Sequence, residues 1–173
     1  VAVALAFAPN IQEAFEFPRF YLIFLFTVYF WISQASSWNI LTGYSGYFSF
    51  GQGAFYGVGV YTVGVLVVKQ GWSFMTALPV AGLLAGATGL FLGLVVFRVR
   101  RLTGEIFALT TLAIAFVLAS VARLSPSIDG GTGIFMTGTP LPEFLGEFTT
   151  AAYHLTLAIA LITVVVAYLI YDS

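Results

Sequence analysis

Side chains able to do chemistry are sparse in this 173-residue sequence, and their densest concentration is a glycine-rich polar run from Asn39 to Tyr61. The run carries six glycines, with Ser, Thr and Gln residues among them. Because glycine weakens a helix interior by about 1 kcal/mol relative to alanine, we expect the chain to break or unwind here. At membrane depth, unpaired backbone is tolerated only inside protein or beside a watery cavity, and transporters use broken helices to present backbone groups to a solute.

The run is therefore predicted to form one wall of a solute path. The candidate polar groups lining the path are Ser45, Ser49 and Gln52, and the glycines expected to let the backbone break are Gly43, Gly46, Gly51 and Gly53. An uncharged path suits a neutral or zwitterionic solute, whose carboxylate would be held by amides at the start of a half-helix rather than by arginine. The alternative interpretation is a cytoplasmic turn followed by close helix packing through small residues.

Other kinds of chemistry are poorly supported by the composition. The chain has no cysteine, a single histidine (His154), six basic and seven acidic residues, and a net charge of −1. These counts exclude disulfides and thiolate catalysis, and they disfavour a metal site, a haem site and nucleic-acid binding. No glycine-rich phosphate loop precedes Lys69, the only lysine, so the ATP-binding loop motif is absent. We expect no catalytic residue, no metal and no cofactor in this chain.

The elements that must position the run are membrane-spanning helices. Hydrophobic residues make up 60% of the sequence and charged residues 8%, against about 25% in a soluble domain. A helix needs about 20 apolar residues to cross a bilayer, and the charge-free stretches are long enough. The predicted spans are 20–41, 48–68, 75–97, 106–124 and 153–171. The predicted fold is an all-α, polytopic transmembrane helix bundle in a single domain over 1–173, with a glycine-rich broken segment before the second span.

Small and basic residues give further expectations for individual spans. Glycines of the third span recur on one face in two GxxxG patterns, which predicts close helix packing without a solute role; they are Gly82, Gly86, Gly89 and Gly93. Three cations follow this span and predict a cytoplasmic loop; they are Arg98, Arg100 and Arg101. In the fourth span, Thr110, Thr111 and Ser120 are expected to bond back to carbonyls one turn earlier. Arg123, near the outer end, is expected to extend to the interface.

Three stretches, in order, resemble the permeases of branched-chain amino-acid ABC transporters. Residues 38–61 (WNILTGYSGYFSFGQGAFYGVGVY) resemble the segment that opens the second core helix of this family. Residues 97–113 (FRVRRLTGEIFALTTLA) and 130–134 (GGTGI) resemble two further family motifs. Urea and short-amide permeases share these motifs. One departure is Phe116, where members often carry an acidic or amide residue.

The resemblance implies the N-terminal part of a longer permease subunit of an ABC importer in the bacterial inner membrane. It implies a branched-chain amino acid or a related small neutral or zwitterionic solute. The implied partners are a second permease subunit, two ATP-binding subunits and a periplasmic solute-binding protein, besides the lipid bilayer. Two alternatives stay open at this point: a passive channel for a small neutral solute such as urea, and a structural membrane subunit.

Overall fold

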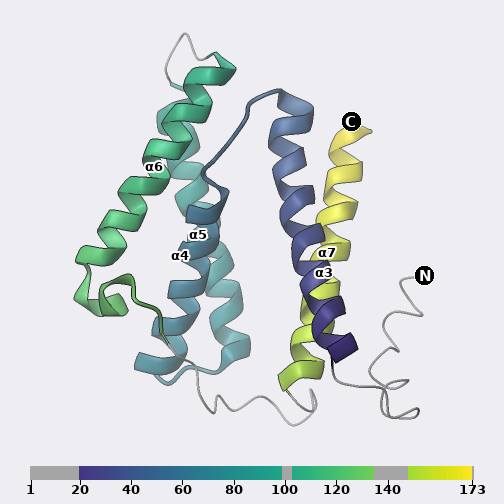
Figure 1. Ribbon diagram of the computed structural model, residues 1–173, viewed down its shortest axis with the longest axis vertical. Coiled ribbons are helices and arrows are strands. Elements are labelled where there is room, and N and C mark those ends of the chain that lie inside the picture. Colours follow the sequence, from purple (N-terminus) through teal and green to yellow (C-terminus); the bar gives the residue numbers. More distant parts are fainter. Residues whose placement is uncertain (1–19, 99–102, 135–147, 173) are drawn as a thin grey trace. The chain divides into compact units, whose positions relative to one another are not determined.

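A computed structural model describes residues 20–98, 103–134 and 148–172 of the chain, and in these residues there are helices and turns but no β-strand. The helical elements, in chain order, are α3 (Phe20–Asn39), η1 (Ile40–Tyr44), α4 (Gln52–Gly64), η2 (Val65–Lys69), α5 (Phe74–Val96), α6 (Gly104–Leu124), η3 (Pro126–Gly131) and α7 (Phe148–Tyr171) (Figure 1). Elements η1 and η2 are π-helical, whereas η3 is a 3-10 helix. The predicted all-α fold is therefore confirmed.

Four of the described helical stretches are long and apolar enough to cross a membrane: Phe20–Tyr44, Phe74–Val96, Gly104–Leu124 and Thr149–Tyr171. Each overlaps one of the predicted spans. The stretch predicted as the second span is helical only from Gln52 to Lys69, including its π-helical end. It rises about 27 Å, close to the thickness of the hydrocarbon core. That this stretch also crosses the membrane stays a prediction, as does the single domain over 1–173.

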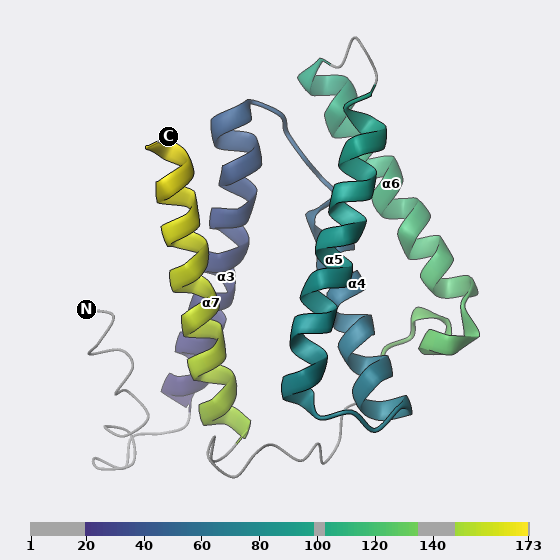
Figure 2. The ribbon, with the colours of Figure 1, turned by 180° about the vertical axis from the view of Figure 1, so that it is seen from behind.

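The described parts of the chain fall into two compact units, one drawn from 1–45 with 141–173 and the other from 46–140. In the first unit, α3 and α7 lie side by side and run in the same direction (Figures 1 and 2). Their contact buries Leu22 and Tyr29 of α3 against Tyr153 and Leu157 of α7. The Tyr29 and Tyr153 hydroxyls are 3.1 Å apart and share a hydrogen bond, so each phenol has a partner within an apolar contact.

The second unit is built on the antiparallel pair α4 and α5. Val63 near the end of α4 and Val67 of η2 pack on Ala77 and Ala81 of α5. The two alanines lie one helical turn apart and are buried, and their small size lets the backbones approach. Helix α6 runs in the same direction as α4 and contacts it, and η3 follows directly at its end (Figure 1). The functional candidates of this unit lie between α4 and α6.

Candidate functional site

The predicted break between the first two helices is present. Residues 46–51 form neither helix nor strand between the π-helical η1 and the start of α4. Gly46 adopts a φ of 74°, in the left-handed region that favours glycine. A Cβ at Gly43 would overlap the side chain of Asn39, so glycine is also favoured there. The glycines thus supply backbone conformations and space that the break uses.

The broken segment 46–51 is fastened to α6 by a hydroxyl group. The backbone N–H of Phe50 donates to Thr111 Oγ1 at 3.1 Å, and the same hydroxyl donates to the Ala108 carbonyl at 2.9 Å. Within the segment, the backbone N–H of Gly51 donates to Ser49 Oγ at 3.3 Å. Ser49 and Thr111 are both buried. Since a partly buried backbone N–H loses free energy without an acceptor, Thr111 favours this position of the segment.

Three aromatic rings add a second attachment for the same segment. Tyr47 of the segment contacts Phe97 at the end of α5 and Phe107 on α6, with ring centroids 5.7 and 5.2 Å apart. Phe97 and Phe107 are stacked with centroids 5.3 Å apart. These separations lie in the favourable range for aromatic pairs. The segment is therefore held to α6 by a polar contact at Phe50 and an apolar one at Tyr47.

A pocket of about 800 Å³ lies between α4 and α6, and we name it the α4–α6 pocket. Its walls are mostly apolar and include small residues on both helices: Gly53, Ala54 and Gly57 on α4, and Ala115, Ala119 and Ala122 on α6. Because these residues have little or no side chain, two neighbouring helices leave open volume between them. Its size lies within the usual range of small-molecule sites, about 300–1,000 Å³.

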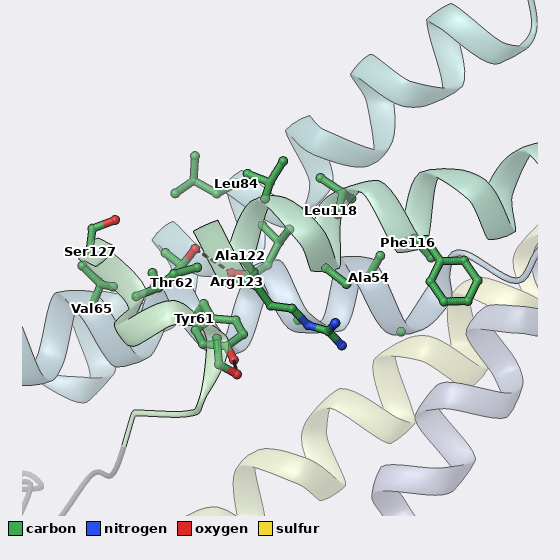
Figure 3. A pocket seen from close by; sticks show the side chains of 18 of the residues that line it. Ala54, Tyr61, Thr62, Val65, Leu84, Phe116, Leu118, Ala122, Arg123 and Ser127 are labelled. Atoms are coloured by element: carbon green, nitrogen blue, oxygen red, sulfur yellow. Dashed lines mark hydrogen bonds between the residues drawn. The ribbon is translucent and has the colours of Figure 1, made fainter. Parts of the chain in front are cut away.

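Polar groups gather at the end of the pocket near η3. Figure 3 shows Tyr61 and Thr62 of α4 together with Arg123 of α6 at this end. The Tyr61 hydroxyl donates to the Gly131 carbonyl at 2.8 Å. Lys69 Nζ lies 2.7 Å from Asp129 Oδ1, which joins the end of η2 to η3. The walls of the pocket are therefore apolar over most of their length. At the polar end, hydrogen-bonded and charged contacts join α4 and η2 to η3.

The structure places the predicted path residues in different surroundings. Gly53 lines the α4–α6 pocket, and so does Phe50 of the broken segment. Gly46, Ser49, Gly51 and Gln52 belong to the same unit as Gly53 but do not line the pocket. Gly43 and Ser45 belong to the other unit, where Ser45 Oγ donates to the Leu41 carbonyl. A solute role for these residues stays a prediction.

The predicted packing glycines have little contact within the described residues. A Cβ at Gly82, Gly86 or Gly93 would meet no atom within 4 Å, and one at Gly89 would lie 3.8 Å from Phe55. Helix α5 packs on α4 through its alanines instead. The glycine face remains predicted to receive another helix. Arg98 lies two residues after the end of α5 and is exposed, whereas Arg100 and Arg101 lie outside the described residues.

Two features of the site were not recognised in the sequence. Thr110 and Ser120 bond back to carbonyls on their own helix, as predicted, but Thr111 also accepts from Phe50. Thr110 and Thr111 both lie within the motif of residues 97–113. Arg123 lines the pocket, although it was predicted only to extend to the interface. Phe116, the noted departure, also lines the pocket.

Metal chemistry has no basis in the described residues, which hold no group of three or more His, Cys, Asp or Glu side chains placed to bind an ion. The geometry instead describes a non-helical segment before α4 next to a mostly apolar pocket. Such an arrangement is typical of transport proteins rather than of enzymes.

Comparison with known proteins agrees with this interpretation. The chain is 38% identical over 116 residues to the high-affinity branched-chain amino acid transport system permease protein LivM of Escherichia coli, and 38% identical over 113 residues to LivM of Salmonella typhimurium. The matches cover 66% and 64% of this chain but 26% and 25% of those proteins, so the chain spans about a quarter of the length of these curated relatives. No solved structure matches the chain.

A permease family model matches a stretch of the sequence that includes every described residue. That family is the branched-chain amino acid transport system permease component, and the match runs over residues 20–173. The four apolar helices fit the multi-pass membrane architecture that such a permease requires. The chain therefore belongs to the branched-chain amino acid transport system permease component family.

Proposed function

We propose that this chain belongs to a permease subunit of an ABC importer that moves branched-chain amino acids, or a related small neutral or zwitterionic solute, across the bacterial inner membrane. The observation that carries the proposal is the α4–α6 pocket beside the broken segment 46–51. An apolar wall of small residues suits an aliphatic side chain, because burial of apolar surface supplies binding energy without strict directionality.

The broken segment supports a role in translocation rather than in static binding. Phe50 lines the pocket while its backbone N–H is held by Thr111, so a movement of segment 46–51 would change the pocket wall. Non-helical segments at membrane depth provide such movable walls in transporters. Ser45, Ser49 and Gln52 are proposed as further polar groups of the path, in the full-length subunit.

The energy for import is proposed to come from partner subunits. The sequence lacks the phosphate-binding loop of ATPases, and no acidic residue lies within its predicted spans to carry a driving ion. Two ATP-binding subunits, a second permease subunit and a periplasmic solute-binding protein would complete the importer. The family membership of the chain supports this assembly.

The proposal is tested by reconstituting the full-length subunit with its partner subunits in proteoliposomes. We expect uptake of radiolabelled leucine only when both ATP and the solute-binding protein are present. Omission of either component, in otherwise identical vesicles, is the matched control. Leucine flux of equal size without ATP would contradict the proposal and would favour a passive channel.

A further inference from the structure

Arg123 brings a positive charge to a mostly apolar pocket. Its side chain lines the α4–α6 pocket, beginning on α6 near Tyr61 and extending toward Ala54 (Figure 3). Within the described residues, its guanidinium has no hydrogen bond and no ion pair. A guanidinium offers five N–H donors in a planar fork that matches a carboxylate. Arg123 thus presents unused donors at the polar end of an apolar pocket.

The nearby acidic residue does not neutralise this charge. Asp129 of η3 is paired with Lys69 at 2.7 Å, so its carboxylate is already engaged. Glu105 lies at the opposite end of α6, about 27 Å away along the helix axis. No other described carboxylate belongs to the unit that contains the pocket. The positive charge of Arg123 is therefore available to an anionic group that enters from outside the chain.

The η3 backbone is shaped around Arg123. A Cβ at Gly131, where φ is +72°, would lie 3.5 Å from the Arg123 backbone nitrogen and 3.6 Å from its Cγ. Gly130, with a φ of +62°, faces the Arg123 carbonyl in the same way. Because neither position carries a side chain, η3 packs directly on the Arg123 backbone and on the first part of its side chain. The Arg123 stem is thereby positioned at the pocket while the guanidinium stays uncommitted.

We infer that Arg123 binds the carboxylate of a zwitterionic solute whose aliphatic side chain lies along the apolar wall of the α4–α6 pocket. The inference rests on the proposed function and names the part of the solute that this end recognises. A charged, bidentate hydrogen bond to a carboxylate is stronger than a neutral one. The earlier expectation that backbone amides alone would hold this group is replaced by a side-chain contact. Val58 and Ala119 are proposed to contact the aliphatic part.

The test is equilibrium binding of radiolabelled leucine to the detergent-purified full-length permease complex without the solute-binding protein. The variants are Arg123→Met, which removes the charge, and Arg123→Lys, which keeps the charge but loses the planar fork. The matched control is Arg98→Met, which removes an exposed arginine that does not line the pocket. Competition with leucinamide, which lacks the carboxylate, reports whether the effect belongs to that group.

We expect Arg123→Met to weaken leucine binding at least about tenfold, Arg123→Lys to weaken it less, and Arg98→Met to leave it unchanged. Leucinamide should compete weakly with leucine for binding, and to the same extent in the parent complex and in the three variants. Unchanged leucine affinity in Arg123→Met, or no leucine binding by the parent complex, would overturn the inference. The inference would also be overturned if an anionic phospholipid co-purified with the parent complex, was absent from the Arg123→Met complex and was not displaced by leucine. If the parent complex imports leucine with ATP in any of these cases, the proposed function survives and only the role of Arg123 is refuted.

Discussion

Replacement of Thr111 by valine removes one hydroxyl group and leaves a side chain of nearly the same shape. In the parent structure this hydroxyl accepts a hydrogen bond from the backbone N–H of Phe50 at 3.1 Å. The residue Thr111 is 8% exposed. A buried N–H left without an acceptor costs about 1–3 kcal/mol, and because this N–H is partly buried that range is an upper bound. We expect this cost to fall on the fastened conformation of segment 46–51, because α6 keeps its own backbone hydrogen bonds.

The expected magnitude follows from that cost. A free-energy change of about 1–3 kcal/mol shifts the ratio of fastened to released segment about 5- to 150-fold. Thr111→Val also loses the hydrogen bond to the Ala108 carbonyl. Thr110→Val loses a similar bond, to the Ile106 carbonyl, but leaves the hydrogen bond between Thr111 and Phe50 in place. Thr110→Val is therefore the matched control. Thr111→Ser keeps the hydroxyl and should behave almost like the parent protein.

The assay is maleimide labelling of a Ser49→Cys variant of the full-length subunit with any native cysteines removed. Residues 1–173 contribute no cysteine, so no removal is needed in this part. Ser49 is 7% exposed, and we expect slow labelling while the segment is fastened. The Thr111→Val background should raise the labelling rate about 5- to 150-fold and lower leucine uptake. A rate within twofold of the Thr110→Val background would refute the assigned role of Thr111.

Three further predictions concern the pocket, the break and η3. Gly53→Leu should fill the α4–α6 pocket and lower leucine uptake more than about tenfold while assembly is retained. Gly59→Leu, on the same helix but outside the pocket, should leave uptake unchanged. Equal uptake by the two variants would count against the pocket as a solute path. Gly46→Ala should destabilise the observed conformation of segment 46–51 by about 1–2 kcal/mol, because a Cβ is strained at a φ of 74°. The rate of limited proteolysis within the segment should therefore rise. An unchanged cleavage rate would contradict the strain. The ion pair between Lys69 and Asp129 is partly exposed. A double-mutant cycle measured by thermal unfolding should therefore give a coupling free energy below about 1 kcal/mol, which falls further in high salt. A larger coupling free energy that does not depend on salt would indicate that the pair is shielded from water.

The membrane architecture was predictable because it depends on composition along the chain. Charge-free stretches of sufficient length indicate helices wherever they occur, and α3, α5, α6 and α7 overlap the predicted spans. The helix break was predictable for a similar reason. Glycine disfavours helix through its own backbone freedom, so the density of glycine between Asn39 and Tyr61 indicated an interruption without knowledge of any neighbour.

The sequence by itself thus determined that the chain is an all-α membrane protein interrupted at a glycine-rich segment, and its motifs indicated the permease family. Only the tertiary structure decided that Thr111, and not the adjacent Thr110, holds the segment, and that Arg123 lines the α4–α6 pocket. Each threonine bonds back to a carbonyl of its own helix, and the difference lies in Phe50, which is far away in the sequence. A pocket wall is likewise made by residues on separate helices, and their spacing along the chain does not record which of them face each other.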